Sequence, residues 1–231
     1  MDILKRFVET TNDGSTTLRI AAWDEPYHSV HGAIQESRHV FINNGLRPCE
    51  RNPIRLLEIG FGTGLNALLS LMEADSRKLP ICYTGIEAYP LTDIEVGQLN
   101  YLQQLNAPAY GELYAQMHTC PWEVKNSLTS FYTLVKHQCN ILEYSAESRF
   151  DLIYFDAFGA GVQPELWTEA VFSQMYRALD TNGILVTYAA RGSVRRAMLA
   201  VGFKVERLPG PPGKREMLRA VKPGLMANVA P

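Results

Sequence analysis

The sequence of 231 residues lacks the features that mark several protein classes. Its four cysteines, Cys49, Cys82, Cys120 and Cys139, form no C-x-x-C pair and no short cluster with histidine, so neither a disulfide framework nor a zinc site is expected. Met1–Asn12 holds no apolar run long enough for a signal peptide or a membrane span. Proline and glycine are scattered rather than repeated, which excludes collagen-like and low-complexity chains. With 46% hydrophobic residues, the sequence predicts a folded, soluble protein of the cytoplasm.

Net charge is also nearly absent, because 22 lysines and arginines face 24 aspartates and glutamates. The balance is uneven along the chain. Residues 190–231 hold nine basic residues against only Glu206 and Glu216, which leaves a net charge of −9 on the other 189 residues. A basic end of this kind favours an anionic partner such as nucleic acid, and the alternative is an ordinary solvated surface.

From Ile54 onward, short apolar runs alternate with amphipathic stretches, which is typical of β-α-β units around a parallel sheet. The expected strands are Arg55–Ile59, Ile81–Glu87, one near Ile141, Asp151–Asp156 and Ile184–Tyr188, followed by a hairpin of Phe203–Leu208 and Met217–Val221. The expected helices are Gly64–Ala74, Thr92–Leu105, Pro164–Leu179 and Ser193–Val201. The pattern therefore predicts a doubly wound α/β domain with a seven-stranded, mostly parallel sheet and an antiparallel C-terminal hairpin strand.

Residues 1–50 do not follow this alternation, and we expect them to form an extension packed on the main domain. They contain an expected strand, Thr17–Trp23, and an expected helix, Gln35–Asn43. The main domain is predicted to cover residues 51–224, with a C-terminal tail at 225–231. The pattern of residues 110–140 predicts no clear element.

A glycine-rich loop is the most informative motif. It follows the strand Arg55–Ile59 with Gly60, Gly62 and Gly64 and then enters a helix, so the backbone can approach a ligand at a helix N-terminus. The spacing G-x-G-x-G differs from the G-x-G-x-x-G of dinucleotide-binding folds, which disfavours a nicotinamide oxidoreductase. Glu58, two residues before the first glycine, would repel a pyrophosphate but suits a cationic ligand such as S-adenosylmethionine.

Two more carboxylates follow predicted strands. Glu87 ends the second strand, where an acid can bind the ribose hydroxyls of a nucleoside. Asp156 ends a buried strand, and ligands of open α/β sheets bind outside the carboxyl ends of the strands. An acid there could hold a substrate amine and accept its proton, while Phe158 could cover an apolar face of the substrate. The alternative for Asp156 is a helix cap or a structural salt bridge.

These motifs resemble a known family. The strings that carry the resemblance are Glu58–Asn66 (EIGFGTGLN), Phe155–Phe158 (FDAF), Gln163–Trp167 (QPELW), Val186–Tyr188 (VTY), Val194–Arg196 (VRR) and Gly213–Leu218 (GKREML), with Tyr27–Ser29 and Glu36–Ser37 nearer the N-terminus. In this order they are similar to the S-adenosylmethionine-dependent methyltransferase that completes 5-methylaminomethyl-2-thiouridine in tRNA. The resemblance runs from Tyr27 to Lys222.

The resemblance implies a Rossmann-like class I methyltransferase that converts the 5-aminomethyl group of wobble 2-thiouridine to 5-methylaminomethyl, without metal or flavin. It implies a cofactor site of Glu58, Gly60, Gly62, Gly64, Asn66 and Glu87, with Asp156 and Phe158 at the amine. The tRNA anticodon stem-loop would contact Tyr188, Arg195, Arg196, Lys214 and Arg215. A separate oxidase or another amine-forming enzyme would supply the substrate.

Two alternatives stay open. The chain could methylate an amine of a small molecule or a protein, in which case the basic end has no role in catalysis. It could also be a non-catalytic tRNA-binding module, for which Asp156 would be dispensable. The tryptophans Trp23, Trp122 and Trp167 are expected to pack in the core or in loops rather than to bind a base.

Overall fold

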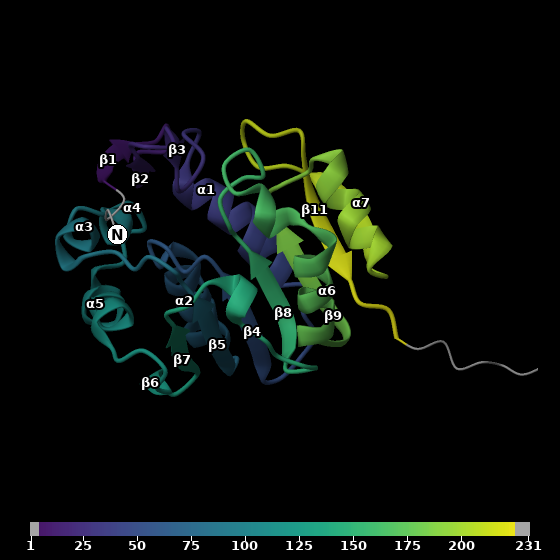
Figure 1. The fold of residues 1–231 in the computed structure, drawn as a ribbon. Helices are drawn as coiled ribbons and strands as arrows, with labels where there is room; N and C mark the ends of the chain where they lie inside the picture. Colours follow the sequence, from purple (N-terminus) through teal and green to yellow (C-terminus); the bar gives the residue numbers. More distant parts are fainter. Residues whose placement is uncertain (1–4, 225–231) are drawn as a thin grey trace, which may run out of the picture.

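An eight-stranded sheet forms the centre of the computed structural model, which describes residues 5–224 (Figure 1). The predicted tail, 225–231, lies outside the described residues. The strands, in spatial order, are β10 (Lys204–Pro209), β11 (Glu216–Val221), β9 (Leu179–Thr187), β8 (Phe150–Phe155), β4 (Ile54–Ile59), β5 (Ile81–Ile86), β7 (Tyr132–His137) and β6 (Asn126–Thr129). The pairs from β9 to β7 are parallel, while β11 pairs antiparallel with both β9 and β10. This confirms the predicted Rossmann-like, mostly parallel sheet with antiparallel C-terminal strands.

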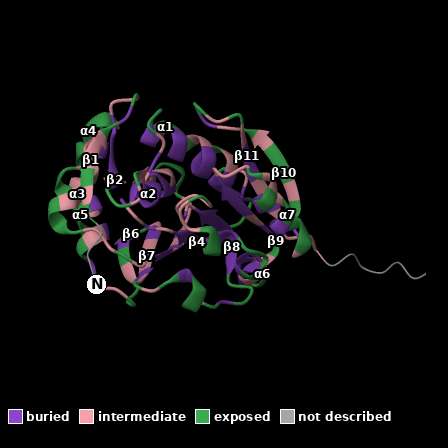
Figure 2. Ribbon diagram, turned by 45° about the horizontal axis from the view of Figure 1, so that its top comes forward, coloured by how far each residue is buried: buried purple, intermediate pink, exposed green. Residues whose placement is uncertain are grey.

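Helices cover both faces of the sheet, because each strand alternates its side chains between two apolar layers. Leu56 of β4 faces a core shared with α1 (Ala33–Ser37), η1 (Arg38–Leu46) and α2 (Leu65–Arg77). Leu57 faces a second core shared with α6 (Glu169–Ala178) and α7 (Gly192–Ala200). Figure 2 shows the buried sheet between these layers and the exposed outer faces of the helices.

The N-terminal residues contribute to one of these layers. The helix η1 continues α1 with wider turns of the π type, and the Arg47 N–H donates to the Ile42 carbonyl, five residues earlier. It lies directly on the sheet, since a Cβ added to Gly45 would stand 2.8 Å from Val186 Cγ2 of β9. The predicted helix Gln35–Asn43 is therefore longer at both ends than the sequence pattern indicates.

A small antiparallel sheet precedes these helices. It consists of β1 (Arg6–Thr10), β2 (Thr16–Ile20) and β3 (Glu25–Pro26), and it lies beside α3 (Asp93–Gly97) and α4 (Tyr101–Gln104) (Figure 1). The Asn100 side chain joins the two parts, accepting from the Thr16 N–H at 2.8 Å and donating to the Gly14 carbonyl at 2.9 Å.

The expectation of seven strands was wrong by one strand. The unassigned segment contains α5 (Gly111–Thr119) and the β6–β7 hairpin, whereas the strand expected near Ile141 is a single 3₁₀ turn, Ile141–Glu143. The sequence pattern does not indicate β7 because this strand buries Lys136 together with Tyr132 and Leu134, and a lysine interrupts the apolar pattern. The edge strand β6 is largely polar and has no apolar signature.

Two expected helices are interrupted. Thr92–Leu105 is split into α3 and α4 because α3 ends at Gly97, a residue that weakens a helix. Pro164–Leu179 begins as a 3₁₀ segment, η4 (Pro164–Trp167), and α6 starts only after Thr168, whose side chain accepts from the Val171 N–H. The remaining strands and helices of the doubly wound domain are confirmed within a few residues at their ends.

The sheet order creates one place where a ligand can enter. β4 is flanked by β5, which follows it in sequence, and by β8, which comes much later, so the connections from β4 and β8 leave in opposite directions. Ligands of open α/β sheets bind at such a switch point, outside the carboxyl ends of the strands.

Candidate active site

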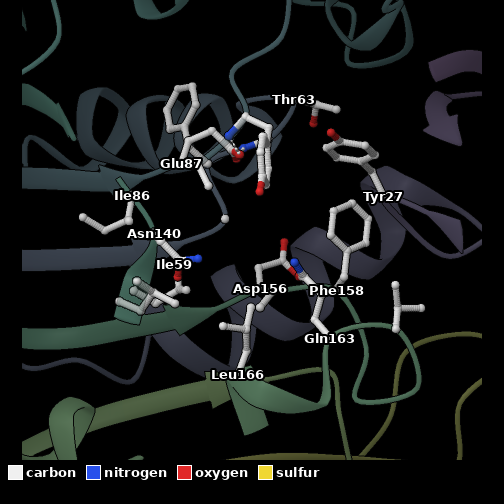
Figure 3. Close-up of a pocket in the computed structure, with 18 of the residues that line it drawn as sticks. Tyr27, Ile59, Thr63, Ile86, Glu87, Asn140, Asp156, Phe158, Gln163 and Leu166 are labelled. Atoms are coloured by element: carbon white, nitrogen blue, oxygen red, sulfur yellow. Dashed lines mark hydrogen bonds between the residues drawn. The ribbon is translucent and has the colours of Figure 1, made fainter. Parts of the chain in front are cut away.

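A cavity of about 260 Å³ lies at this switch point (Figure 3). Its walls come from the segments after β4, β5, β7, β8 and β9 and from the N-terminal loop at Trp23–His28. Figure 3 shows Glu87 and Asn140 toward one end of the cavity, Tyr27 and Phe158 toward the other, and Asp156 between them. We call these the Glu87 end and the Phe158 end.

The glycine loop after β4 forms one wall. Gly60 has a φ of 87° and Gly62 a φ of 50°, a region that other residues rarely adopt. A Cβ on Gly60 would lie 2.7 Å from the Asp156 carbonyl oxygen, so glycine is also required for the close approach of the two strand ends. Gly64 does not line the cavity. It precedes the first residue of α2 with a φ of 71° and sets the start of that helix.

At the Glu87 end, a carboxylate is held by two backbone groups. Glu87 Oε2 accepts from the Gly62 N–H at 2.8 Å, and Oε1 accepts from the Tyr89 N–H at 2.8 Å. A buried polar atom in the cavity wall beside Asp156, Asn66 Oδ1, has no hydrogen-bond partner in the described part of the chain. Buried polar groups are nearly always paired, so this atom indicates a polar ligand.

Glu58, expected to face the cofactor, does not line the cavity. It lies on the α2 face of β4 with 1% of its surface exposed, because strand alternation turns it away from the opening. Tyr83 donates to Glu58 Oε2 at 2.6 Å and Asn66 Nδ2 donates to Oε1 at 2.9 Å. Burial raises the pKa of Glu58 well above its usual value. Its contact with a ligand is therefore indirect, through Asn66.

Asp156 lines the cavity just beyond β8. Asn66 Nδ2 donates to Asp156 Oδ2 at 2.8 Å, so one amide group orients both Asp156 and the buried Glu58. Burial, followed by the negative charge of Glu36, raises the pKa of Asp156 to about 7. A carboxylate with a pKa near neutrality can both accept and release a proton under ordinary conditions.

Aromatic rings enclose the Phe158 end. The Phe158 ring packs edge to face against Tyr27, with centroids 4.9 Å apart, and against Trp23, at 5.6 Å. Tyr188 also lines the cavity, and its hydroxyl donates to the Ala157 carbonyl at 2.8 Å. Trp23 lies in a turn and packs on Phe158, in line with the expected loop packing, and it also lines the cavity.

The basic side chains expected to bind substrate are outside the cavity. Arg196 and Arg215 are exposed, Arg195 is half-buried, and none of the three lines it. Lys214 is not free for a phosphate. Its Nζ is 2.6 Å from Glu36 Oε1 and 3.8 Å from the centroid of the Tyr188 ring.

Several wall residues carry no motif of their own. Tyr27 and Trp23 come from the N-terminal loop, Asn140 follows β7, and Gln163 precedes η4. Tyr27 and Glu36 fall in short strings of the resemblance, but no spacing rule assigns them to a site. Only the tertiary fold brings them to the strand ends.

Within residues 5–224, no group of three or more His, Cys, Asp or Glu side chains is arranged to hold a metal ion. No helix in this range combines the length and the apolar character that a membrane crossing requires.

Comparison with known proteins gives consistent matches. A family model described as S-adenosyl-L-methionine-dependent methyltransferase matches residues 113–223. The tRNA 5-methylaminomethyl-2-thiouridine biosynthesis bifunctional protein MnmC of Aromatoleum aromaticum is 32% identical over 219 residues, covering 90% of this chain and 34% of that protein. The protein of the same name from Ectopseudomonas mendocina is 30% identical over 210 residues, covering 85% and 32%. The chain therefore spans about a third of the length of these curated relatives.

Solved structures are also similar. The crystal structure of MNMC2 from Aquifex aeolicus superimposes with a TM-score of 0.78 at 27% identity, covering 96% of this chain and 71% of that one. Spermidine synthase from Thermotoga maritima superimposes with a TM-score of 0.58 at 16% identity, covering 96% and 70%, and this likeness concerns the fold alone.

Proposed function

This chain belongs to the family of S-adenosyl-L-methionine-dependent methyltransferases that includes the methyltransferase domain of the MnmC proteins, and from this premise we propose that it methylates the 5-aminomethyl nitrogen of wobble 2-thiouridine in tRNA. The product would be the 5-methylaminomethyl group. The observation that carries the proposal is the position of Asp156, a carboxylate inside an aromatic enclosure that adjoins the glycine loop.

The Glu87 end fits the cofactor. When bound, S-adenosyl-L-methionine supplies a methyl group on a cationic sulfur. Glu87 would accept hydrogen bonds from the ribose hydroxyls, and the backbone after β4 has the glycines that a close approach requires. The unpartnered Asn66 Oδ1 would pair with a polar group of the cofactor. We include Gly60 and Gly62 in the cofactor wall, whereas Gly64 and Glu58 support it from behind.

Asp156 would act on the amine. Nitrogen attacks with a neutral lone pair, so the nitrogen must be deprotonated and correctly oriented before it reacts. Ionised Asp156 accepts a hydrogen bond from the amine N–H, which fixes the direction of the lone pair, and it can take the proton released as the nitrogen gains a methyl group. Asn66 keeps the carboxylate in place through its 2.8 Å hydrogen bond.

The aromatic enclosure would receive the uracil ring. Sequence-specific RNA recognition targets unstacked bases, which pack against aromatic side chains, and the anticodon loop presents such bases. Phe158, Tyr27 and Trp23 offer rings at the Phe158 end, and they exclude water from the reacting nitrogen. Exposed Arg196 and Arg215 would contact phosphates of the anticodon stem-loop.

One experiment tests the proposal. The protein is incubated with S-adenosyl-L-methionine labelled at the methyl group and with tRNA from cells that lack the final methylation, and the nucleosides are then separated. Label is expected in the wobble nucleoside, and an Asp156→Asn variant that still binds cofactor is the matched control. Label in an added polyamine or protein, with none in tRNA, would favour the small-molecule or protein alternative. Cofactor binding without any transfer would contradict the catalytic role.

A further inference from the structure

A partly buried ion pair joins two distant segments of the chain beside the Phe158 end. Glu36 lies in α1, and Lys214 lies in the loop between β10 and β11. Lys214 Nζ is 2.6 Å from Glu36 Oε1, and the Glu36 side chain is only 7% exposed. Glu36 Oε2 also accepts from the Ser29 N–H at 2.7 Å. One carboxylate therefore binds both the hairpin loop and the N-terminal loop.

Both partners reach the cavity walls through direct contacts. Lys214 Nζ stands 3.8 Å from the centroid of the Tyr188 ring, and Tyr188 in turn holds the Ala157 carbonyl at 2.8 Å. Ala157 lies between Asp156 and Phe158 in the sequence. On the other side, Ser29 follows Tyr27 by two residues, and the Tyr27 ring packs on Phe158 at 4.9 Å.

The contacts form a closed path around the Asp156–Phe158 segment. From Lys214 it runs through Tyr188 to the backbone beside Asp156, and from Glu36 it runs through the N-terminal loop to the Phe158 ring. Neither side chain lines the cavity itself. If Lys214 is removed, Glu36 is left as a buried, unpaired charge, and if Glu36 is removed, both Lys214 and the Ser29 N–H lose their shared partner, so the path opens in either case.

We propose that Glu36 and Lys214 are positioning residues for methyl transfer, which hold the N-terminal loop and Tyr188 against the Asp156–Phe158 segment and so aim the Asp156 carboxylate at the substrate nitrogen. This inference rests on the proposed function. It assigns Lys214 a role different from that of a phosphate contact.

The charges also act on Asp156 from a distance. The titratable and charged groups around it are Glu36, Lys214, Glu58 and Tyr188, together with the Asn66 amide. The negative charge of Glu36 raises the pKa of Asp156, and the positive charge of Lys214 lowers it. Removal of Glu36 should therefore lower the pKa of Asp156, and removal of Lys214 should raise it.

The kinetic test compares Lys214→Met and Glu36→Gln with Arg219→Met. Arg219 lies on β11 of the same hairpin and pairs with Glu206 at 2.8 Å, so its variant removes an equal charge and an ion pair away from the cavity. With saturating tRNA, both test variants should lower kcat roughly 10- to 100-fold and leave the Kd of S-adenosyl-L-methionine unchanged. The acid limb of the pH profile should move to higher pH in Lys214→Met and to lower pH in Glu36→Gln. Lys214→Arg should restore part of the activity.

The second readout needs no activity. Hydrogen exchange is measured over segments 23–32 and 156–163, and exchange in both should be faster in Lys214→Met but unchanged in Arg219→Met. Faster exchange only around residues 210–215 would overturn the inference. So would a Lys214→Met enzyme with normal kcat and weaker tRNA affinity, because Lys214 would then be a phosphate contact. A wild type that fails to methylate tRNA contradicts the proposed function, while the exchange data still decide whether the ion pair holds the loops.

Discussion

The two ends of the cavity are built in different ways. At the Glu87 end the backbone of the glycine loop holds the Glu87 carboxylate, and both follow directly from neighbouring parallel strands. At the Phe158 end the wall is made of side chains from the N-terminal loop, the segment after β8 and the residue after β9. A backbone wall suits a ligand that never changes, whereas a side-chain wall can be adapted to a substrate. Under the proposed function, this difference predicts that cofactor binding and substrate choice can be altered separately.

The largest expected effect tests this separation at Asp156. Asp156→Asn keeps the shape of the side chain but removes the proton acceptor, so kcat for methyl transfer to tRNA should fall about 10²- to 10⁴-fold. The Kd of S-adenosyl-L-methionine, measured by calorimetry, should change by less than about twofold, since a hydrogen bond from Asn66 to a neutral acceptor remains possible. A loss of cofactor affinity as large as the loss of turnover would show that the two ends are not separable.

The converse effect is expected at Glu87. Glu87→Gln removes the charge that would hold the ribose hydroxyls, and hydrogen bonds to charged groups are worth about 1.5–3 kcal/mol. The Kd of S-adenosyl-L-methionine should therefore rise roughly 10- to 100-fold, while kcat at saturating cofactor stays near the wild-type value. Glu112→Gln, on the exposed first turn of α5, is a control with the same chemical change outside the cavity.

A stability measurement tests the raised pKa of Asp156. Burial raises the pKa of Asp156 from 3.8 to about 7, so the folded protein binds more protons than the unfolded chain between these values. The contribution of this group to the free energy of unfolding is fully present below pH 3.8 and is lost as the pH rises toward 7. Asp156→Asn should thus stabilise the cofactor-free protein by on the order of 2 kcal/mol at pH 8 and by less at pH 5. Melting temperatures at the two pH values provide the test, and an equal gain at both would contradict the raised pKa.

The smallest effect is expected on the exposed surface outside the cavity. Arg215→Ala should weaken tRNA binding only a few-fold and reduce the slope of log affinity against log salt by about one, because one phosphate contact is lost. Arg77→Ala, at the exposed C-terminal end of α2, is the matched control and should leave the slope unchanged. Equal slopes for all three proteins would remove Arg215 from the tRNA surface.

The difference between the two ends also explains how much the sequence could predict. The loop from Glu58 to Asn66 is contiguous, and Glu87 and Asp156 directly follow apolar strands, so their meeting at one edge of the sheet follows from strand order. The local pattern did not predict that Glu58 is buried and hydrogen-bonded to Asn66. Its other partner, Tyr83, comes from the neighbouring strand, so no spacing around Glu58 indicates the contact.

The Phe158 end could not be predicted in this way. Lys214 and Glu36 are 178 residues apart, and nothing in either neighbourhood indicates the other. Lysine at the end of a glycine-rich turn is usually solvated, so the sequence favours a phosphate contact for Lys214 and gives no sign of its ion pair with Glu36. The same limit explains β7, where the buried Lys136 donates to the His118 carbonyl at 2.7 Å and interrupts an otherwise regular strand pattern.

The packing of η1 against the sheet has a consequence for the order in which parts of the core are buried during synthesis. Gly45 allows the helix to approach Val186, a residue that leaves the ribosome about 140 residues later. At a synthesis rate of about 5–20 residues per second, roughly 7 s or more separate the synthesis of Gly45 from that of β9. During this time β9 does not cover the apolar side of η1. The apolar side of η1 is therefore buried only after β9 has been synthesised.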